Sequence, residues 1–585
     1  MRNAKIVCTV GPASDSTEKL QALADAGMSV ARMNASHGSP EHRRTVIDRV
    51  REVDAASDHA VAVMHDLPGP EVRTAPLDEP IVLEPGSTVR FVEGVEATPE
   101  EIGVSHGIAA VEHGDRVLLD DGRIETTVES IEGSVVTATV ENGGTLGGRK
   151  GVNVPGVELG LPTVTEKDRR ELEVAAEEGV DLVAASFVRD GEFVHEISRA
   201  LAELGADIPV VAKIERDVAV EHIDSIIDAA YGVMVARGDL GVEMPLEDVP
   251  MIQKRIIRKC HHAGVPVITA TEMLDSMVAA RRPTRAEASD VANAVLDGTD
   301  AVMLSGETAM GDHPVRVVET MDRIVRQVER SAEYDEHREQ RVPDADETEA
   351  DALARAARYL ARDIDATAVV AASESGYTAL KAAKFRPPIP VVASTPNDDV
   401  RRRLALSWGT VSELAPYTTE GADAVIDNAV QSALDTGVAE SGDTVVVLSG
   451  MMTELEGANT SNVLKIHVAS ETIGSGRSVV SGLVSGEFHW TEDGDLSSVP
   501  EGAILGVPAG FDGEFAGDVE KLAGIIDSHQ GLTGYATMVA RELRIPMIAG
   551  AKLSDETVDG DVVTLDADRG IVYDDVTHER RHGGE

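Results

Sequence analysis

The sequence contains very little cysteine and no long apolar run. Its 585 residues include only two cysteines, Cys8 and Cys260. This is too few for a disulfide framework and indicates a reducing environment. No apolar stretch reaches the length of a membrane-spanning helix, and no signal peptide precedes the first apolar run. A chain of this length should hold three or four domains. We therefore expect a multidomain cytoplasmic protein.

Basic residues are also scarce. Lys and Arg number 53 against 103 Asp and Glu, a net charge of −50, and only about a dozen of the bases are lysines. A phosphate backbone would be repelled, so we expect no nucleic-acid partner. The acids are dispersed over expected helix faces, which suits molar salt, where the Debye length is about 3 Å. We predict a halophilic protein that unfolds at low ionic strength; an acidic mesophilic protein is the alternative.

Short apolar runs that end in polar clusters recur along the first half of the chain. Runs of about five small and β-branched residues are typical of strands buried on both faces, and helix-length segments between them indicate parallel crossovers. The runs lie at 4–11, 29–37, 60–73, 182–189, 209–215, 232–239, 266–272 and 301–307. Eight such runs predict an α/β fold, a closed (β/α)8 TIM barrel with its active site at the carboxyl ends of the strands.

The helical pattern stops for roughly 85 residues after the third run, where short alternating segments and turn signals replace it. This predicts a small β-barrel domain inserted as a lid above the barrel rim. Strands and helices alternate again from about 350 to 465, which predicts an open α/β domain. The expected domains are a barrel at 1–71 and 159–340, a lid at 72–158, a C-terminal α/β domain at 345–467 and a last domain at 475–578.

The polar residues at the strand ends have the chemistry of a phosphoryl-transfer site. Glu215 and Asp239 follow neighbouring strands and suit one divalent cation such as Mg²⁺. Arg32, Arg73 and Lys213 converge on the same mouth and can neutralise a transferring phosphoryl group. The other candidates are oxygen ligands for a monovalent cation (Asn34, Ser36, Asp66), amides for a small carboxylate (236–239) and proton-transfer groups (Thr271, Ser305, Glu307).

A long ordered series of motifs resembles the pyruvate kinase family. The motifs are RMNASHG at 32–38, DLPGPEVRT at 66–74, GVNVPG at 151–156, LPTVTEKD at 161–168, KIER at 213–216, MVARGDLGVE at 234–243 and the run from RRPTRAEAS to GDHP at 281–314. The resemblance extends to about residue 465. It implies transfer of the phosphoryl group of phosphoenolpyruvate to ADP, giving pyruvate and ATP in glycolysis. It also implies Mg²⁺ (or Mn²⁺), K⁺ and a homotetramer.

The resemblance also implies a role for each matching residue. Lys213, Arg32 and Arg73 would stabilise the phosphoryl group, and Glu215 and Asp239 would hold Mg²⁺. The remaining implied roles are K⁺ ligands (Asn34, Ser36, Asp66 and the Leu67 carbonyl), substrate contacts (Gly238, Thr271), proton relay to carbon 3 (Ser305, Glu307), nucleotide contacts (Arg32, His37, Arg73, Lys150) and the lid (Asp121).

Three positions bear on how this chain resembles or departs from the family. Glu71 is the acid that accompanies K⁺ dependence in the family, and a carboxylate beside Asp66 would add negative charge for a cation to offset. Pro68 stands where Lys or Gln is frequent, and Glu272 stands where Gln is common. We predict K⁺ dependence. The departures at Pro68 and Glu272 leave the nucleotide contacts and the reaction rate open.

The turn after the first strand of the α/β domain is a candidate effector site. Ser373, Ser375, Gly376 and Thr378 form a hydroxyl-rich start of a helix, which suits a phosphate, although an ordinary capped helix start is an equal alternative. Pyruvate kinases can carry a sugar-phosphate site here, but Glu374 replaces the frequent Lys and would repel a phosphate. Activation by fructose 1,6-bisphosphate is therefore not expected.

The last hundred residues resemble the phosphohistidine swivelling domain of phosphoenolpyruvate synthase and pyruvate phosphate dikinase. Tyr535 stands where that motif has its phosphoacceptor His, and His529 lies six residues earlier, outside the motif. We expect a catalytically silent domain. The alternatives for the whole chain are a barrel that makes or breaks carbon–carbon bonds at pyruvate enolates, a dikinase-like enzyme that makes phosphoenolpyruvate, and a non-catalytic sensor.

Overall fold

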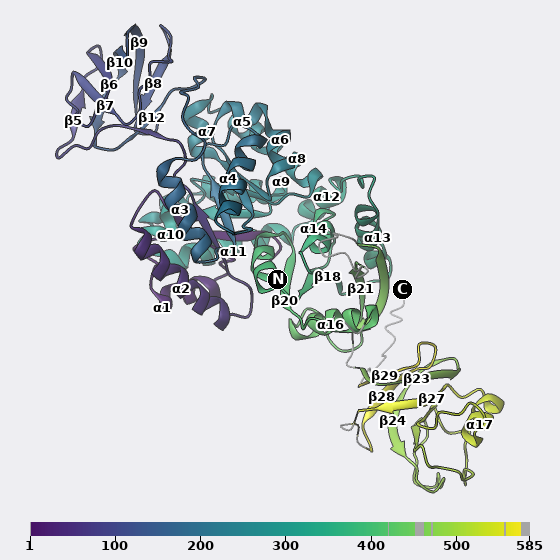
Figure 1. The fold of residues 1–585 in the computed structure, drawn as a ribbon. Helices are drawn as coiled ribbons and strands as arrows, with labels where there is room; N and C mark the ends of the chain where they lie inside the picture. The colour runs from purple at the N-terminus through teal and green to yellow at the C-terminus, as the bar shows by residue number, and fades with distance from the viewer. Residues whose placement is uncertain are drawn as a thin grey trace. The chain divides into compact units, whose positions relative to one another are not determined.

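The computed structural model describes residues 2–418, 421–450, 461–469, 472–554, 557 and 559–574. The chain forms two compact units, one of 1–355, 373–387 and 395–414, the other of 356–372, 388–394 and 415–585. Figure 1 shows the elements of each. None of the described helices has the length and apolarity that a membrane-spanning helix needs.

Eight parallel strands close into a barrel and confirm the predicted TIM fold. Their order around the barrel is β1-β17-β16-β15-β14-β13-β3-β2. The bounds are β1 Lys5–Val10, β2 Val30–Asn34, β3 Ala62–Asp66, β13 Leu182–Ala185, β14 Val210–Ile214, β15 Gly232–Ala236, β16 Val267–Ala270 and β17 Ala301–Leu304. The strands are almost wholly buried, because small and β-branched side chains fill both the interior and the layer under the helices.

Helices of the barrel cover its outer face. They are α1 Thr17–Asp25, α2 Pro40–Ala56, α3 Glu166–Glu177, α4 Gly191–Glu203, α5 Asp217–Glu221, α6 Ile223–Ala229, α7 Arg237–Glu243, α8 Val249–Ala263, η1 Asp275–Val278, α9 Arg285–Asp297, α10 Gly306–Ala309, α11 Pro314–Glu329 and α12 Ala332–Gln340. Several begin at a side-chain cap, and Thr165 and Thr284 each form a capping box with the acid three residues later.

The inserted segment after β3 is a near-closed β-barrel, as predicted. Its strands are β4 Val72–Arg73, β5 Ile81–Leu83, β6 Thr88–Glu93, β7 Glu101–Val104, β8 Arg116–Leu119, β9 Ile124–Glu132, β10 Val135–Asn142, β11 Gly144–Leu146 and β12 Gly151–Asn153. Seven of them form one sheet in the order β4-β12-β8-β9-β10-β6-β7. A bridge between Thr74 and Val104 brings its two edges together. The expected start of this domain at 72 coincides with β4.

The α/β domain has a five-stranded sheet in the order β20-β19-β18-β21-β22, with β22 antiparallel to β21. Its elements are α13 Glu349–Asp363, β18 Ala368–Ala372, α14 Tyr377–Lys384, β19 Val391–Thr395, α15 Asp398–Arg403, η2 Leu404–Leu406, β20 Thr410–Leu414, α16 Ala422–Asp435, β21 Asp443–Ser449 and β22 Val463–Ala469. The expected boundary at 467 falls inside β22.

The last domain is a closed barrel in the order β23-β27-β26-β25-β24-β28-β29. Its elements are β23 Thr472–Val480, β24 Leu483–Trp490, β25 Ile504–Val507, β26 Gly524–Asp527, α17 Tyr535–Leu543, β27 Met547–Leu553, β28 Val562–Asp566 and β29 Ile571–Asp574. The expected boundary at 475 falls inside β23, and the expected residues 575–578 lie outside the described part of the chain.

Candidate active site

Lys213 is the centre of the barrel rim. Its Nζ lies 2.8 Å from Glu215 Oε1, 3.5 Å from Asp66 Oδ1 and donates to the Ser186 hydroxyl at 2.8 Å. Burial lowers the pKa of Lys213, but Asp66 and Glu215 raise it by more, so the pKa lies above its ordinary value. The ammonium group therefore stays charged at any physiological pH. It can stabilise an anion, and it cannot serve as a base.

Arg32 and Arg73 occupy different surroundings. Arg32 is buried on β2, where its Nε donates to Asp66 Oδ2 at 2.6 Å and its Nη1 to the Thr9 hydroxyl at 2.8 Å. Burial raises the pKa of Asp66, but Arg32 and Lys213 outweigh burial and lower it. Arg73, on β4 of the lid, pairs with Glu71 at 2.8 Å, and its side chain is 40% exposed. Arg73 is thus the cation with access to a ligand in solution.

The expected effect of Glu71 on Asp66 requires a correction. Burial raises the pKa of Glu71, the Arg73 charge lowers it, and the neighbouring acids that raise it further are Glu215 and Asp121. The charge of Asp66 is instead balanced by the two cations that contact it. Glu71 therefore pairs with Arg73 and lies near enough to Glu215 and Asp121 for their charges to raise its pKa.

Glu215 and Asp239 form the carboxylate pair expected to hold a divalent cation. Glu215 is buried, and its Oε2 accepts the Phe187 N–H at 2.6 Å. Burial, followed by the charge of Glu215, raises the pKa of Asp239 to about 7. Two such carboxylates fit a divalent cation, which would relieve their repulsion. Among the described residues no group of three or more His, Cys, Asp or Glu could hold a metal.

The expected K⁺ ligands gather at the ends of β2 and β3. Asn34 and Asp66 are directly paired in register across these strands. Asn34 Oδ1 accepts the Ser36 N–H at 3.0 Å, and the Leu67 carbonyl accepts the Ser186 hydroxyl at 2.8 Å. One anionic oxygen group among neutral oxygens is a donor set that fits a monovalent cation.

Thr271 has a strained backbone directly after β16. Its φ is +69°, a region that a β-branched residue rarely adopts. Its hydroxyl accepts the Gly238 N–H at 2.7 Å, and its carbonyl accepts Nη2 of Arg237 at 2.6 Å. Arg237 also pairs with Asp290 at 2.7 Å. Arg237 therefore holds the turn, while the Thr271 hydroxyl and the start of α7 face each other.

Ser305 and Glu307 follow β17. Glu307 is buried, and its carboxylate accepts the Ser305 N–H at 2.7 Å and the Leu274 N–H at 3.1 Å. Burial raises its pKa, against the opposing effect of backbone hydrogen bonds. Because both oxygens bind backbone amides, this contact geometry positions the two loops. The expected part of Ser305 and Glu307 in a proton relay stays a prediction.

The lid reaches the rim through the turn after β8 and through β12. Asp120 and Asp121 both have positive φ, and Asp120 binds Lys150 at 2.7 Å. Asn153 donates to Glu243 of α7 at 3.2 Å. A cleft between lid and barrel is lined by Pro70, Glu71, Val72, Asp121, Val152, Asn153, Leu159, Leu161, Phe187, Arg216 and Asp239. Asp121 thus shares a cleft with Asp239, whereas Lys150 is held by Asp120.

Two residues of this site received no role from the sequence. Ser186, at the end of β13, links Lys213 to the Leu67 carbonyl. Lys167, at the start of α3, shifts the pKa of His37: burial lowers that pKa first, and the charges of Arg73, Lys167 and Arg32 lower it further. His37 therefore lies among three cations. The signal for Lys167 was its place in the LPTVTEKD motif, which ends next to a helix start.

The candidate effector turn is a capped helix start. Ser373 Oγ accepts the Thr378 N–H at 3.2 Å, Ser375 Oγ accepts the Tyr377 N–H at 3.4 Å, and Gly376 has a φ of +83°. Both serine hydroxyls thus bind first-turn amides of α14 that a phosphate would otherwise contact. These contacts favour the plain capping alternative over a phosphate site.

The motif position of the last domain is filled by aromatic packing. Tyr535 contacts Phe515 edge to face with ring centres 5.5 Å apart, and Phe515 stacks on Phe511 at 5.7 Å. His529 Nδ1 accepts the Gly531 N–H at 3.0 Å. This contact holds His529 in its own loop, outside the motif position.

Three family models match this chain in order. The barrel domain of pyruvate kinase matches residues 1–318, and the alpha/beta domain of pyruvate kinase matches 351–467. The mobile domain of PEP-utilising enzymes matches residues 499–570. The three matches correspond to the barrel with its lid, to the α/β domain and to the part of the closed C-terminal barrel from β25 to β28.

Curated relatives match along almost the whole chain. A pyruvate kinase of Geobacillus stearothermophilus is 43% identical over 583 residues, covering 98% of each chain. A pyruvate kinase of Bacillus licheniformis is 41% identical over 583 residues, and one of Staphylococcus aureus is 40% identical over 582. The similarity therefore includes the C-terminal barrel as well as the site. The chain belongs to the pyruvate kinase family.

Proposed function

We propose that this member of the pyruvate kinase family transfers the phosphoryl group of phosphoenolpyruvate to ADP at the carboxyl rim of its TIM barrel. The bond from phosphorus to the enol oxygen breaks, and a bond to an oxygen of the ADP β-phosphate forms. The enolate left behind takes a proton at carbon 3 and becomes pyruvate. The observation that carries the proposal is the permanently charged Lys213, 2.8 Å from Glu215 at the rim where Arg32 also lies.

The basic residues divide the work of charge stabilisation. Lys213 is fixed by three contacts, so it needs little reorganisation when charge moves across the transferring phosphoryl group. Arg32 is fixed by Asp66 and Thr9 and orients the phosphoryl group at the end of β2. Arg73, His37 and Lys150 lie toward the lid and contact the nucleotide. Because its side chain is exposed, Arg73 adapts to the nucleotide more readily than the buried Lys213 and Arg32 do.

The carboxylate and neutral oxygens hold the cations of the reaction. Glu215 and Asp239 would hold Mg²⁺ (or Mn²⁺), and Asn34, Ser36, Asp66 and Leu67 would hold K⁺. When bound, these ions supply positive charge to the phosphoryl and carboxylate oxygens of the substrate. The amide of Gly238 and the hydroxyl of Thr271, which bond to each other at 2.7 Å, exchange this bond for contacts with the substrate carboxylate and enolate. Ser305 and Glu307 belong to the relay that delivers a proton to carbon 3.

The remaining parts of the proposal rest on family and composition. We place the enzyme in the cytoplasm as a homotetramer adapted to high salt, with 103 acidic residues on a chain of 585. Asp121 closes the site from the lid when substrate binds. The C-terminal barrel is catalytically silent, because Tyr535 packs against Phe515 where a phosphohistidine would stand.

The experiment is an assay of pyruvate formation from phosphoenolpyruvate and ADP in molar KCl with Mg²⁺. The parent should be active, and Lys213→Met should lose at least about 10³-fold in kcat with folding intact. Lys259→Met is the matched control, because Lys259 pairs with exposed Asp224 on the outer helices. A folded, metal-loaded parent without activity would contradict the proposal and favour enolate chemistry or a silent scaffold.

A further inference from the structure

A buried polar triad lies just outside the active site and has no role in the proposed chemistry. His65 on β3, Glu171 on α3 and Arg43 on α2 are each at most 5% exposed. His65 Nε2 lies 3.0 Å from Glu171 Oε2, and Nη2 of Arg43 binds the other oxygen, Oε1. Three separate elements therefore meet at one carboxylate. Groups of this kind are costly to bury, so their partners require an explanation.

Arg43 extends the triad to the loop that follows β2. Its Nη1 donates to the carbonyl oxygen of His37 at 2.7 Å. The same loop is tied to β3 at its start, where the Ala35 N–H donates to the Asp66 carbonyl at 2.9 Å. After His37 the chain turns at Gly38, whose φ is +73°. The loop from Asn34 to Gly38 is thus anchored at one end by β3 and at the other by Arg43.

The charges show why Arg43 needs Glu171. Burial raises the pKa of Glu171, but the hydrogen bond from His65 and the Arg43 charge lower it by more, so the carboxylate stays ionised. The ionised Glu171 balances the charge of the buried Arg43 guanidinium and fixes its plane by accepting a hydrogen bond from Nη2. The other nitrogen can then hold a backbone carbonyl in a fixed position. His65 directly precedes Asp66 in β3, so the triad is continuous with the rim.

We propose that Arg43, held by Glu171 and His65, is a positioning residue that sets the geometry of the loop 34–38 for K⁺ and nucleotide. The inference rests on the proposed function, in which Asn34 and Ser36 are K⁺ ligands and His37 contacts the nucleotide. Phosphoenolpyruvate contacts made by Lys213 and Thr271 come from other strands, and Arg32, which precedes the loop on β2, is fixed by Asp66 and Thr9 and not by the triad. A defect in the triad should therefore weaken the binding of K⁺ and ADP and leave the binding of phosphoenolpyruvate largely unaffected.

The test compares Arg43→Lys with Arg44→Lys. Lysine keeps the charge at 43, but a single ammonium cannot keep the planar two-sided contact with Glu171 and the His37 carbonyl. Arg44 is the neighbour on the same helix, and it pairs with Glu177 and Glu178 at the surface of α3. Arg43→Lys should raise the half-saturating K⁺ concentration and the KM for ADP about tenfold each, and the KM for phosphoenolpyruvate less than about threefold. Arg44→Lys should change none of them.

Two measurements without turnover accompany the kinetics. Calorimetry gives the Kd of MgADP, and the Tm is followed as K⁺ replaces tetramethylammonium at constant ionic strength. In Arg43→Lys the Kd should rise about tenfold and the K⁺-induced rise in Tm should need about tenfold more K⁺. Saturating K⁺ should restore kcat. If the parent shows no transfer to ADP, the proposed function fails, while these two measurements still decide the positioning role.

Glu171→Gln and His65→Asn provide variants further from the loop. Both should show the same selective pattern to a smaller extent, which keeps the test decisive if Arg43→Lys folds poorly. Equal losses of K⁺, ADP and phosphoenolpyruvate affinity together with a lowered Tm would assign the triad a purely structural role and overturn the proposal. Indistinguishable behaviour of Arg43→Lys and Arg44→Lys would overturn it as well.

Discussion

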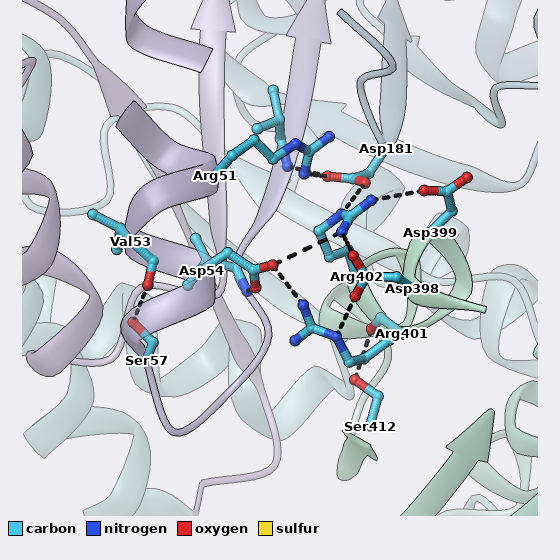
Figure 2. A network of polar contacts seen from close by, with 12 residues as sticks. Arg51, Val53, Asp54, Ser57, Asp181, Asp398, Asp399, Arg401, Arg402 and Ser412 are labelled. Atoms are coloured by element: carbon cyan, nitrogen blue, oxygen red, sulfur yellow. Dashed lines mark hydrogen bonds and ion pairs between the residues drawn. The ribbon is translucent and has the colours of Figure 1, made fainter. Parts of the chain in front are cut away.

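Nε of Arg402 lies 2.8 Å from Oδ1 of Asp181, in a network that joins α15 to the amino-terminal ends of barrel strands (Figure 2). The Asp181 side chain is fully buried and also binds Arg51 at 2.7 Å and the Val63 N–H at 2.7 Å. Asp54, near the end of α2, binds Arg401 at 2.5 Å and accepts the Val61 N–H, just before β3, at 2.8 Å. Both aspartates therefore join the start of β3 to an arginine of α15.

Arg402→Met should destabilise the fold by about 3 kcal/mol, because it leaves Asp181 short of one of its two cations in a buried site. Denaturant unfolding in molar KCl measures this. Arg199→Met, which removes an exposed pair with Glu192, should cost less than about 1 kcal/mol. Combined with Asp181→Asn, Arg402→Met should cost much less than the sum of the two single changes. If the two changes in the free energy of unfolding were strictly additive, the Arg402–Asp181 contact would not contribute to stability.

His261 should make stability depend on pH. It is 9% exposed on α8, its Nε2 lies 3.0 Å from the Lys384 carbonyl, and burial followed by the Arg386 charge lowers its pKa to about 3. Its ordinary pKa is about 6.5, so the unfolded chain takes up the proton first as pH falls. The contribution is fully present above pH 6.5 and is lost as pH falls toward 3. Protonation of His261 in the unfolded chain should lower the free energy of unfolding by about 2 kcal/mol between pH 6.5 and 5.

His261→Gln removes this titration and keeps an N–H donor for the Lys384 carbonyl. Its free energy of unfolding in molar KCl should therefore fall less steeply between pH 6.5 and 5 than that of the parent. The comparison of slopes separates titration from any constant loss of packing. Parallel curves for parent and variant would show that His261 is accessible to protons in the folded state.

Activity should depend on K⁺. Glu71 pairs with Arg73, so this arginine cannot also supply the free positive charge that a monovalent cation gives near the phosphate path. Replacing K⁺ by tetramethylammonium at constant ionic strength should reduce kcat by at least about tenfold. Glu71→Lys is the informative variant, because it removes the carboxylate that neutralises Arg73 and adds a second cation, which together should lessen the dependence. Full activity of the parent without K⁺ would contradict this prediction.

The barrel and its rim were predictable because the required signals are local. A buried parallel strand is a short apolar run, and its carboxyl end is the next residue, so Lys213 and Asp239 could be placed at one mouth from spacing alone. The lid was equally visible as a change from helical to alternating periodicity. The expected domain boundaries at 467 and 475, which lie inside β22 and β23, stay predictions, since strand ends carry no comparable signal.

The partners of the charged residues could not be predicted. Spacing put Glu71 near Asp66, but the turn at Gly69, where a Cβ would lie 2.8 Å from Ser186, redirects the chain and pairs Glu71 with Arg73. Lys167 and the Arg43–Glu171 contact join segments more than a hundred residues apart, and one sequence holds no record of such pairs. Long-range polar contacts therefore needed coordinates, whereas the strand ends did not.

Stability should rise with salt. The chain carries 103 acids and 53 bases, so about half of its carboxylates have no basic partner to offset them. Salt weakens surface ion pairs and like-charge repulsion alike, and with this excess of one sign the relief of repulsion is the larger effect. The Tm should rise by at least about 10 °C from dilute buffer to molar KCl. A Tm that does not move would favour the acidic mesophilic alternative.

The C-terminal barrel should not carry a phosphoryl group. Tyr535 has no ring nitrogen and is packed edge to face on Phe515, and His529 lies outside the motif position, where its Nδ1 accepts a hydrogen bond from Gly531. Incubation with phosphoenolpyruvate and Mg²⁺ should leave no acid-labile, alkali-stable phosphate in the parent or in Tyr535→Phe. Tyr535→His tests whether the aromatic packing alone prevents transfer. If His529→Gln abolished a phosphohistidine signal seen in the parent, that histidine would be an acceptor despite its hydrogen bond, and the silent domain would have to be given a catalytic role.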